Sequence, residues 1–284
     1  MILISGAGGK TGKAILKRLL QRGAKIRAMI HHARQQAELK ALGVNDVVCG
    51  DMRQRAFMFQ ALESVEAIYH ICPNMSPDEF KIGRLVMEAA RSRGVKHFVY
   101  HSVLHPQAQQ MPHHWNKLKV ETEIFASGLN YTILQPTAYM QNILAYWPSI
   151  VSEGVYILPY TAETRVALVD LDDVADAAVK VILEPGFKSG IYELVGTPAF
   201  TQTEIAQKIS AKLGRTVRVE TLSRVHWEAE VRKNGMPEYA IQTLLKMFIY
   251  YETYGMEGNS SVLEWILARS PVTYGQFLDR ILAH

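Results

Sequence analysis

The sequence has few cysteines and no long apolar run. Its 284 residues include two cysteines, Cys49 and Cys72, with no CxxC spacing. So few cysteines fit a reducing compartment, and we expect a cytoplasmic protein. Both lie in apolar strand-like runs, where we expect small buried hydrophobes. No run is long enough to span a membrane, and residues 1–4 lead straight into glycines, which predicts a buried strand and no signal peptide.

Acidic residues are scarce near the N-terminus. Residues 1–50 contain nine Lys or Arg and two acids, Glu38 and Asp46, within a chain of net charge +4. A basic cluster of this kind can face nucleic acid or the phosphates of a cofactor. Because this cluster coincides with a glycine-rich turn, we expect cofactor phosphates and a small-molecule substrate, with neither nucleic acid nor a membrane as partner.

Two further chemistries lack support in the sequence. His101 and His105 flank a predicted strand end, and no nearby acid completes a metal-ligand set at the usual spacings, so we predict no metal site. The chain also lacks a G-x-S-x-G elbow, which disfavours a serine hydrolase.

Short segments rich in Val and Ile alternate with helical patterns in the first half. The predicted strands are residues 2–5, 25–30, 46–49, 67–72, 97–101 and 131–135. The predicted helices are residues 12–21, 33–42, 54–62, 77–93 and 113–127. Strands and helices that alternate over short connections imply parallel strands joined by right-handed crossovers. The pattern predicts a doubly wound α/β fold of the Rossmann type.

The pattern becomes less regular beyond Pro148. Short strands are predicted at residues 155–158, 165–169, 191–195 and 217–220, and helices near 174–183, 202–213 and 237–253. We expect residues 1–150 to form a dinucleotide-binding core. Residues 151–284 are predicted to form a smaller α/β region on the substrate side, interleaved with the core and packed over the carboxyl ends of the strands.

Three glycines, at positions 6, 9 and 12, directly follow the first predicted strand and open the first helix. Glycine takes the strained φ of a tight turn at little cost, and its missing Cβ lets a diphosphate approach the helix N-terminus. A Walker A loop would need glycine at Ile4, and G-x-G-x-x-G would need glycine at Thr11. A purely structural glycine turn remains the alternative. The predicted diphosphate-binding residues are Gly6, Gly8, Gly9, Lys10, Thr11 and Gly12.

The segment after the second predicted strand decides between NAD and NADP. An acid there would bind the ribose hydroxyls and repel a 2′-phosphate, but no acid precedes Glu38. Arg34, with His31 and Lys10, can meet a phosphate, and the planar fork of arginine suits that contact. NADP(H) is therefore the favoured cofactor, and NAD(H) stays open.

Asp51 and Met52 follow the third predicted strand, where an adenine ring would lie. Asp51 can accept a hydrogen bond from the adenine amine, or it can cap the next helix.

Helical spacing separates two lysines near residue 117. Lys117 shares a face with the apolar residues Val120, Ile124 and Phe125, so we expect it to point toward the sheet. Lys119 falls on the opposite, solvated face, where it can pair with Glu123. Burial lowers the pKa of a lysine, which suits proton transfer, and an ammonium can also hold a ribose hydroxyl. A lysine that snorkels from the edge of the core is the alternative.

His113 lies one turn before Lys117 on the same side, which makes it a second candidate for chemistry. Its neighbours His114 and Trp115 could serve equally.

Several motifs together resemble the NmrA-like group of atypical short-chain dehydrogenases. They are Gly6–Gly12, Gly50-Asp51, His97–Val103, His113–Lys117 with Val120-Glu121, Tyr131–Pro136, Tyr139–Asn142 and Asp172–Ala175. The resemblance covers nearly the whole chain and is specific in combination. It implies a Rossmann core, a small C-terminal substrate region and NADP(H). Members include quinone and isoflavone-type reductases and also redox-sensing regulators that bind the dinucleotide without turnover.

The resemblance also implies roles for single residues. Lys117 matches a catalytic or cofactor-positioning lysine, and Ser102 matches the serine of ordinary short-chain dehydrogenases. Their tyrosine, four residues before the lysine, is replaced by His113, which argues against ordinary alcohol dehydrogenase chemistry. Many relatives have arginine at Gln135 and at His31, and the second difference weakens the NADP prediction.

We therefore expect an NAD(P)H-dependent oxidoreductase that passes a hydride to a small quinone- or enone-like substrate. The nicotinamide would lie near Cys72, Pro73, Pro136 and Thr137. The expected pocket walls are Tyr139, Met140, Trp147 and Tyr156. The competing hypothesis is a non-catalytic dinucleotide sensor that acts through a protein partner. A sugar-nucleotide epimerase would need the Tyr-x-x-x-Lys pair, which is absent.

Overall fold

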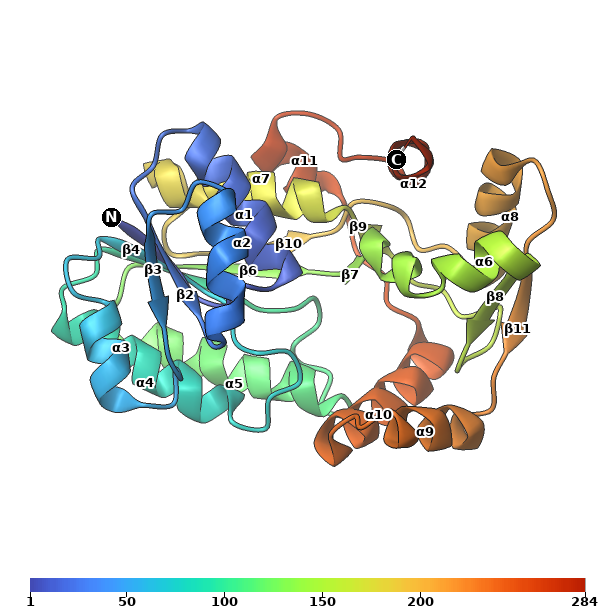
Figure 1. The fold of residues 1–284 in the computed structure, drawn as a ribbon, viewed down its shortest axis with the longest axis horizontal. Helices are drawn as coiled ribbons and strands as arrows, with labels where there is room; N and C mark the ends of the chain where they lie inside the picture. The colour runs from blue at the N-terminus through green and yellow to red at the C-terminus, as the bar shows by residue number, and fades with distance from the viewer. Residues whose placement is uncertain (284) are drawn as a thin grey trace. The chain divides into compact units, whose positions relative to one another are not determined.

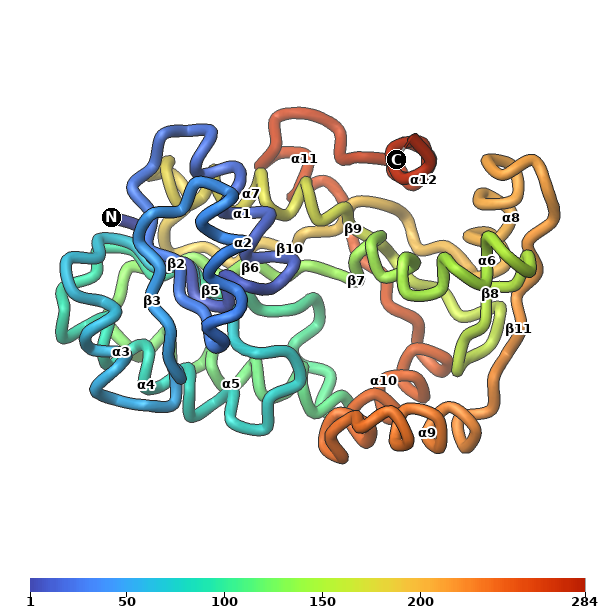
Figure 2. The backbone as a smooth tube through the Cα atoms, viewed as in Figure 1, coloured from blue at the N-terminus to red at the C-terminus, as the bar shows by residue number. Residues whose placement is uncertain are grey.

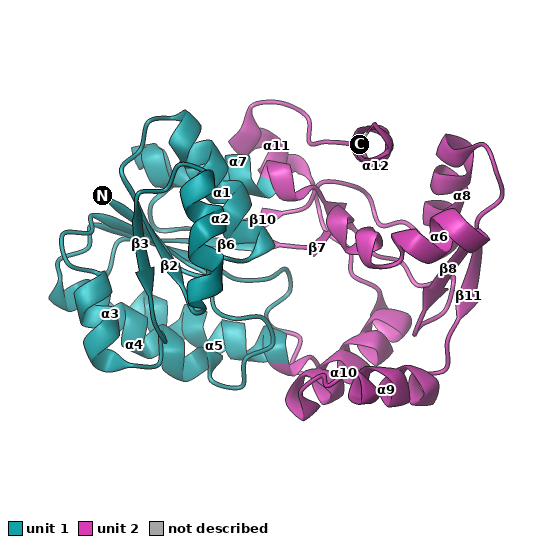
Figure 3. Cartoon of the chain, in the orientation of Figure 1, with its two compact units in different colours: residues 1–107, 113–135, 174–192 teal, residues 108–112, 136–173, 193–284 magenta. Residues whose placement is uncertain are grey.

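The computed structural model describes residues 1–283, and the chain divides into two compact units (Figure 3). Unit 1 contains residues 1–107, 113–135 and 174–192, and unit 2 contains residues 108–112, 136–173 and 193–284. The chain leaves unit 1 after Gln135 and returns to it at Val174, near the start of helix α7 (Leu171–Leu183). The colours of Figure 2 follow this path. The two units are thus interleaved along the sequence.

Unit 1 is built on a seven-stranded sheet with the order β10-β6-β5-β4-β1-β2-β3. The strands are β1 (Ile2–Ile4), β2 (Ile26–Ile30), β3 (Asp46–Cys49), β4 (Ala67–His70), β5 (His97–His101), β6 (Tyr131–Pro136) and β10 (Gly190–Leu194). Every pair from β3 to β6 is parallel. The strand order reverses direction at β1 and β4, which is where sheets of this kind bind ligands. The predicted doubly wound Rossmann fold is confirmed.

Helices cover both faces of this sheet (Figure 1). One face carries α1 (Lys10–Gln21), η1 (Ala33–Gln35), α2 (Gln36–Ala41) and α7 (Leu171–Leu183), and Arg18 of α1 pairs with Asp176 of α7 at 2.6 Å. The other face carries α3 (Arg55–Ala61), α4 (Glu79–Ser92) and α5 (Pro112–Ala126).

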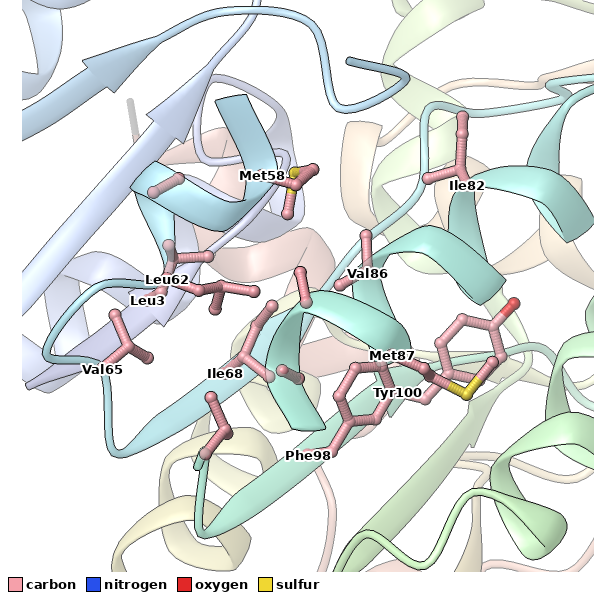
Figure 4. Packing of buried hydrophobic residues seen from close by; sticks show 14 of the residues in the cluster. Leu3, Met58, Leu62, Val65, Ile68, Ile82, Val86, Met87, Phe98 and Tyr100 are labelled. Atoms are coloured by element: carbon pink, nitrogen blue, oxygen red, sulfur yellow. The ribbon is translucent and has the colours of Figure 1, made fainter. Parts of the chain in front are cut away.

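The core of unit 1 explains why its central strands read as continuous apolar runs. All residues of β4 and β5 are buried, as expected for strands with helices on both faces. Leu3, Ile68 and Phe98 from the strands pack against Met58 of α3 and Val86 of α4 (Figure 4). Cys72 is buried as predicted. The prediction for Cys49 was wrong, because it ends the edge strand β3 and is exposed.

Unit 2 has two sheets of two strands each, in contrast to the seven-stranded sheet of unit 1. Its strands form two parallel pairs, β7 (Ala138–Tyr139) with β9 (Leu168–Val169), and β8 (Val155–Leu158) with β11 (Arg218–Thr221). Its helices are η2 (Met140–Ala145), α6 (Trp147–Glu153), α8 (Gln202–Leu213), α9 (Arg224–Lys233), α10 (Glu238–Tyr254), α11 (Ser261–Leu267) and α12 (Tyr274–Leu282). The short turn η3 (Pro185–Phe187) belongs to unit 1.

Ion pairs close the C-terminal part of unit 2 on itself. The buried carboxylates Asp170 and Asp173 pair with Arg280 at 2.5 Å and Arg269 at 2.7 Å. Buried carboxylates need such partners, because an unpaired charge away from water is strongly unfavourable. Within residues 1–283, helices long and apolar enough to cross a membrane are absent.

Candidate active site

The glycine turn after β1 is shaped by contacts between backbone atoms. Gly6 adopts a φ of +61°, in the left-handed region that favours glycine. A Cβ on Gly12 would lie 2.5 Å from the Gly6 carbonyl oxygen and 2.7 Å from the Ala7 Cα. Because both obstacles are backbone atoms, no side chain can be accommodated there. Gly9 caps α1 without a side-chain hydrogen bond, and a helix start of that kind offers backbone N–H groups to an anion.

Gly8 lies against a side chain that the sequence did not point out. A Cβ on Gly8 would come within 2.2 Å of the Gln35 amide nitrogen, so the Gln35 side chain lies directly against the glycine turn. Gln35 also accepts a hydrogen bond from the His32 backbone N–H at 3.3 Å. A side chain at position 8 would displace the flexible Gln35 side chain from the glycine turn.

The end of β2 presents basic side chains to solvent. His31 and Arg34 are both exposed, as is Lys10 at the start of α1. The first acid after the strand, Glu38, pairs with Lys13 at 2.5 Å. Residues 31–37, directly after the strand, contain no acid that could hold ribose hydroxyls, which agrees with the predicted preference for a 2′-phosphate.

Asp51 does not cap α3, which begins at Arg55 with Gln54 as its N-cap. Instead its carboxylate accepts bonds from the Arg53 backbone N–H at 2.9 Å and from the Arg53 guanidinium at 2.7–3.0 Å. These hydrogen bonds lower the pKa of Asp51. Met52 beside it is half-buried. The interpretation of Asp51 as a helix cap was wrong because Arg53 completes a tight local turn, and its role toward adenine stays a prediction.

Buried polar groups follow β1 and β4 where the strand order reverses. The Ser5 hydroxyl lies 3.0 Å from His70 Nδ1 and accepts a bond from the Ile71 backbone N–H at 2.8 Å. Burial lowers the pKa of His70 to about 3, so its imidazole is neutral at pH 7. Cys72 is buried beside the exposed Pro73, and burial raises the pKa of its thiol.

Lys117 points toward the sheet, as the helical spacing predicted. Its ammonium donates to Glu79 Oε1 at 2.6 Å and to the His101 carbonyl oxygen at 3.2 Å. It also lies 5.4 Å from the centre of the Tyr100 ring. The ammonium is thus held at the carboxyl end of β5, with 15% of the side chain exposed.

The rest of the face prediction for α5 holds in part. Val120 and Ile124 are buried with Lys117, but Phe125 is 49% exposed and was wrongly placed in the core. Lys119 is solvated as predicted, yet its partner is Asn116 Oδ1 at 3.0 Å. Glu123, the predicted partner of Lys119, lies 3.7 Å from Arg84 of α4 instead.

His113 is buried one turn before Lys117. Its Nδ1 has no hydrogen-bond partner among residues 1–283, and its ring meets the His114 ring edge-on at 4.4 Å. Burial, and then the neighbouring His114 and Lys117, lower the pKa of His113 to about 2. The ring is therefore neutral at physiological pH.

Ser102 belongs to a buried network of a different kind. Its hydroxyl donates to Glu121 Oε1, and the Gln135 amide donates to both oxygens of the same carboxylate at 3.0 and 3.1 Å. Burial raises the pKa of Glu121 despite these bonds. The Ser102 proton is committed to Glu121, which the resemblance to ordinary dehydrogenases did not predict.

The remaining predicted residues lie in unit 2. The Thr137 hydroxyl donates to the Ala167 carbonyl oxygen at 2.9 Å, and Pro136 ends β6. Met140 and Tyr156 are buried, and the Tyr156 hydroxyl donates to Gln202 at 3.1 Å. Tyr139 and Trp147 are half-buried. A role of these side chains in a substrate pocket stays a prediction.

The sequence analysis did not single out Glu79, which binds the Lys117 ammonium, or Tyr100, which donates to Glu79. Glu79 is 2% exposed, and its Oε1 also accepts the Tyr100 hydroxyl at 2.8 Å. A signal existed for Glu79, since it starts a helix whose other inward positions are apolar. A lone acid at a helix start, however, is ordinarily a solvated partner of the helix dipole.

Comparisons with known proteins identify the family of this chain. A sequence model described as the NmrA-like family matches residues 1–274. The chain is 26% identical over 279 residues to the NAD(P)H azoreductase of Xenophilus azovorans, which covers 98% of this chain and 96% of that protein. It is also 26% identical over 283 residues to quinone oxidoreductase 2 of Escherichia coli strain K12, with 99% and 98% covered.

Solved structures give the same picture. The NADPH complex of an NADPH-dependent quinone oxidoreductase from Escherichia coli superimposes with a TM-score of 0.87 at 26% identity, covering 99% of this chain and 100% of that chain. A triphenylmethane reductase from Citrobacter sp. in complex with NADP(H) reaches 0.86 at 23% identity, covering 99% of each, which shows the fold alone. The predicted resemblance is confirmed: this chain belongs to the NmrA-like family.

Proposed function

We propose that this chain passes a hydride from NADP(H) to a small conjugated acceptor of the quinone or enone type, with Lys117 acting at the reacting centre. The observation that carries the proposal is the Lys117 ammonium, fixed by Glu79 and the His101 carbonyl at the carboxyl end of β5. It lies in the same compact unit as a glycine turn suited to a diphosphate.

The class of enzyme and its cofactor rest on agreement between the site and the relatives. The full-length relatives include an NAD(P)H azoreductase and a quinone oxidoreductase, and the matching crystal structure holds NADPH. The chain is an NAD(P)H-dependent oxidoreductase, and NADP(H) is the favoured dinucleotide. Both predictions made from the sequence are confirmed at this level.

The residues present fit that dinucleotide. Gly6 and Gly12 leave a bare backbone turn at the start of α1, which would receive the diphosphate. Arg34 and His31 would meet the 2′-phosphate, because they stand exposed where an NAD-specific enzyme carries an acid. When bound, the dinucleotide supplies the hydride.

Reduction of a quinone consumes one hydride and one proton, so the protein must present a proton donor. An ammonium has three N–H donors, and the contacts with Glu79 and His101 use two of them. The third would hold a ribose hydroxyl of the cofactor or relay the required proton from solvent to the acceptor oxygen. Hydrogen bonds from charged donors are the stronger kind, which suits both roles.

His113 would act as a neutral hydrogen-bonding group. A neutral imidazole carries one donor and one acceptor nitrogen, and the buried Nδ1 has no hydrogen-bond partner among residues 1–283. His113 stands at the sequence position where ordinary relatives have a tyrosine, and a ligand that reaches Nδ1 would satisfy it. Ser102 would support the site by orienting Glu121, because its own proton is already donated.

The sensor alternative is not favoured by the relatives. The regulator NmrA superimposes with a TM-score of 0.82, but its identity of 15% shows only a common fold. The substrate side, in which Tyr139, Met140, Trp147 and Tyr156 would line a pocket, is proposed on the resemblance alone. A cytoplasmic location remains a prediction in the same way.

The test is NADPH oxidation with a panel of quinones, enones and azo compounds. We expect turnover by the parent and a loss of about 100-fold in Lys117→Ala, within the range for a lost proton-transfer group. Lys119→Ala is the matched control, since Lys119 is exposed on the same helix and should leave turnover unchanged. If the parent binds NADPH tightly but reduces no acceptor, the sensor hypothesis gains and the proposal fails.

A further inference from the structure

Glu79 is a buried carboxylate that the proposed chemistry does not itself use. It is the first residue of α4, with 2% of the side chain exposed. A carboxylate without water must be ionised beside a cation or become protonated. Glu79 has both a cation, Lys117 at 2.6 Å, and a neutral donor, the Tyr100 hydroxyl at 2.8 Å. The position at a helix start also favours its negative charge.

Three elements meet at this carboxylate. Glu79 comes from α4, Tyr100 from β5 and Lys117 from α5, and the two donors reach the same oxygen, Oε1. Tyr100 is fully buried, and burial, then Glu79, raise the pKa of its hydroxyl. Tyr100 therefore stays protonated and keeps donating to Glu79. The Glu79 carboxylate thus fixes the position of the Lys117 ammonium, which a flexible, four-carbon side chain would not keep alone.

The four histidines around Lys117 are uncharged near neutral pH. Burial lowers the pKa of His70 and His101 to about 3, of His113 to about 2 and of His114 to about 4. Burial raises the pKa of the Cys72 thiol. Burial also raises the pKa of Glu121, whose carboxyl group accepts hydrogen bonds from Ser102 and Gln135. Glu79 is the carboxylate that directly contacts the ammonium.

We propose that Glu79 is the positioning residue of this active site: its buried carboxylate, braced by the Tyr100 hydroxyl, holds Lys117 as an ammonium with one N–H left for the ligand. The loss of this contact lets the Lys117 side chain leave its fixed position and swing toward solvent. The effect on the position of Lys117 is a property of the folded chain. Only its consequence for turnover rests on the proposed function.

The primary experiment measures the reactivity of Lys117 without any cofactor or substrate. An amine reagent such as acetic anhydride modifies only uncharged, accessible lysines, and mass spectrometry of the Lys117 peptide gives the rate. We expect labelling in Glu79→Gln to be about tenfold faster than in the parent at pH 8, the size of effect that a lost charge-assisted hydrogen bond produces. Glu88→Gln, an exposed carboxylate of the same helix paired with Arg55, should change nothing.

A second readout follows the catalytic consequence. In Glu79→Gln, kcat for NADPH oxidation should fall about tenfold relative to the parent, because the ammonium is no longer held in place by a charge-assisted hydrogen bond. Glu79→Asp keeps the charge on a shorter side chain and should lie between the two. A purely structural role for Glu79 would instead lower the urea midpoint of unfolding and leave the turnover of each folded molecule unchanged.

The outcomes separate the two proposals. Unchanged labelling of Lys117 in a folded Glu79→Gln protein overturns the role of Glu79, whatever the activity. If labelling is faster in Glu79→Gln but the parent reduces no acceptor, the role of Glu79 stands and only the proposed reaction fails. If Glu79→Gln fails to fold, Glu79→Asp decides, since its carboxylate cannot reach the same position and equal labelling there contradicts the proposal.

Discussion

The glycine turn and the Lys117 cluster lie in one compact unit but are built in different ways. The turn uses seven consecutive residues and obtains its shape from missing side chains, with Gly12 Cα facing the Gly6 carbonyl. The cluster joins Glu79, Tyr100 and Lys117, which lie up to 38 residues apart, through buried charges. Local backbone sterics leave a mark on the sequence that a reader can recognise, whereas an ion pair across helices does not. The two should also fail differently when altered.

The largest expected effect is on the cluster. Lys117→Met leaves the Glu79 carboxylate buried without its cation, and breaking a buried pair from one side typically lowers the free energy of unfolding by about 3–5 kcal/mol. The double variant Lys117→Met/Glu79→Gln removes the orphaned charge and should be more stable than the single variant. Urea unfolding measures both. Equal stability of the single and double variants would mean that the pair is not buried as described.

The glycine turn should respond to the addition of atoms. Gly12→Val places methyl groups into the Gly6 carbonyl and the Ala7 backbone, and overpacking of this kind lowers the free energy of unfolding by about 1–3 kcal/mol. We also expect calorimetry to detect no NADPH binding, because the turn must deform. Gly186→Ala is the control, since a Cβ there meets nothing within 4 Å. Normal binding by Gly12→Val would refute the assignment of the turn.

The buried histidine between the two regions should make stability depend on pH. The pKa of His70 is about 3 in the folded protein and 6.5 ordinarily. Below pH 6.5 the unfolded chain therefore takes up a proton that the folded chain refuses, and stability falls as the pH drops toward 3. His70→Asn should reduce this slope by up to about 1.4 kcal/mol per pH unit. His226→Asn, at an exposed histidine of α9, is the control, and equal slopes in all three proteins would contradict the prediction.

The smallest expected effect lies at the rim of the dinucleotide site. Arg34 is exposed, so its contact with a 2′-phosphate is partly screened, and Arg34→Ala should weaken NADPH binding about tenfold or less. NADH binding should not change, because NADH lacks that phosphate. Fluorescence titration with both nucleotides gives the ratio. An equal loss for NADPH and NADH would place Arg34 elsewhere on the cofactor.

Predictions from the sequence succeeded where the signal is periodic or local. The Rossmann strands, the helix near residues 202–213 and the inward direction of Lys117 were all predicted correctly. Helix α9 was missed because none of its residues is buried, so it has no apolar stripe to recognise. Helix α11 was missed because its seven residues give too short a pattern. Helix α12 was missed although it has a local signal, the capping box of Thr273 and Gln276.

The errors in assigning side-chain partners share one feature: the actual partner lies on another part of the chain. Phe125, Lys119 and Glu123 were assigned from positions on one helix, but Arg84 of the neighbouring helix α4 draws Glu123 away. Ser102 was assigned by resemblance, and the carboxylate that receives its proton, Glu121, lies 19 residues along the chain. Spacing on a helix fixes direction, and the choice among several partners within reach depends on the elements packed against it.

The sequence by itself determined the Rossmann core, the glycine turn after the first strand and the lysine that faces the sheet. These follow from strand and helix periods and from positions that only glycine can occupy, and both are set by neighbouring residues. The tertiary structure alone decided that Glu79 and the His101 carbonyl hold Lys117, and that Ser102 donates to Glu121. Burial is the physical reason, since the energy of a charge depends on which distant groups replace the water around it.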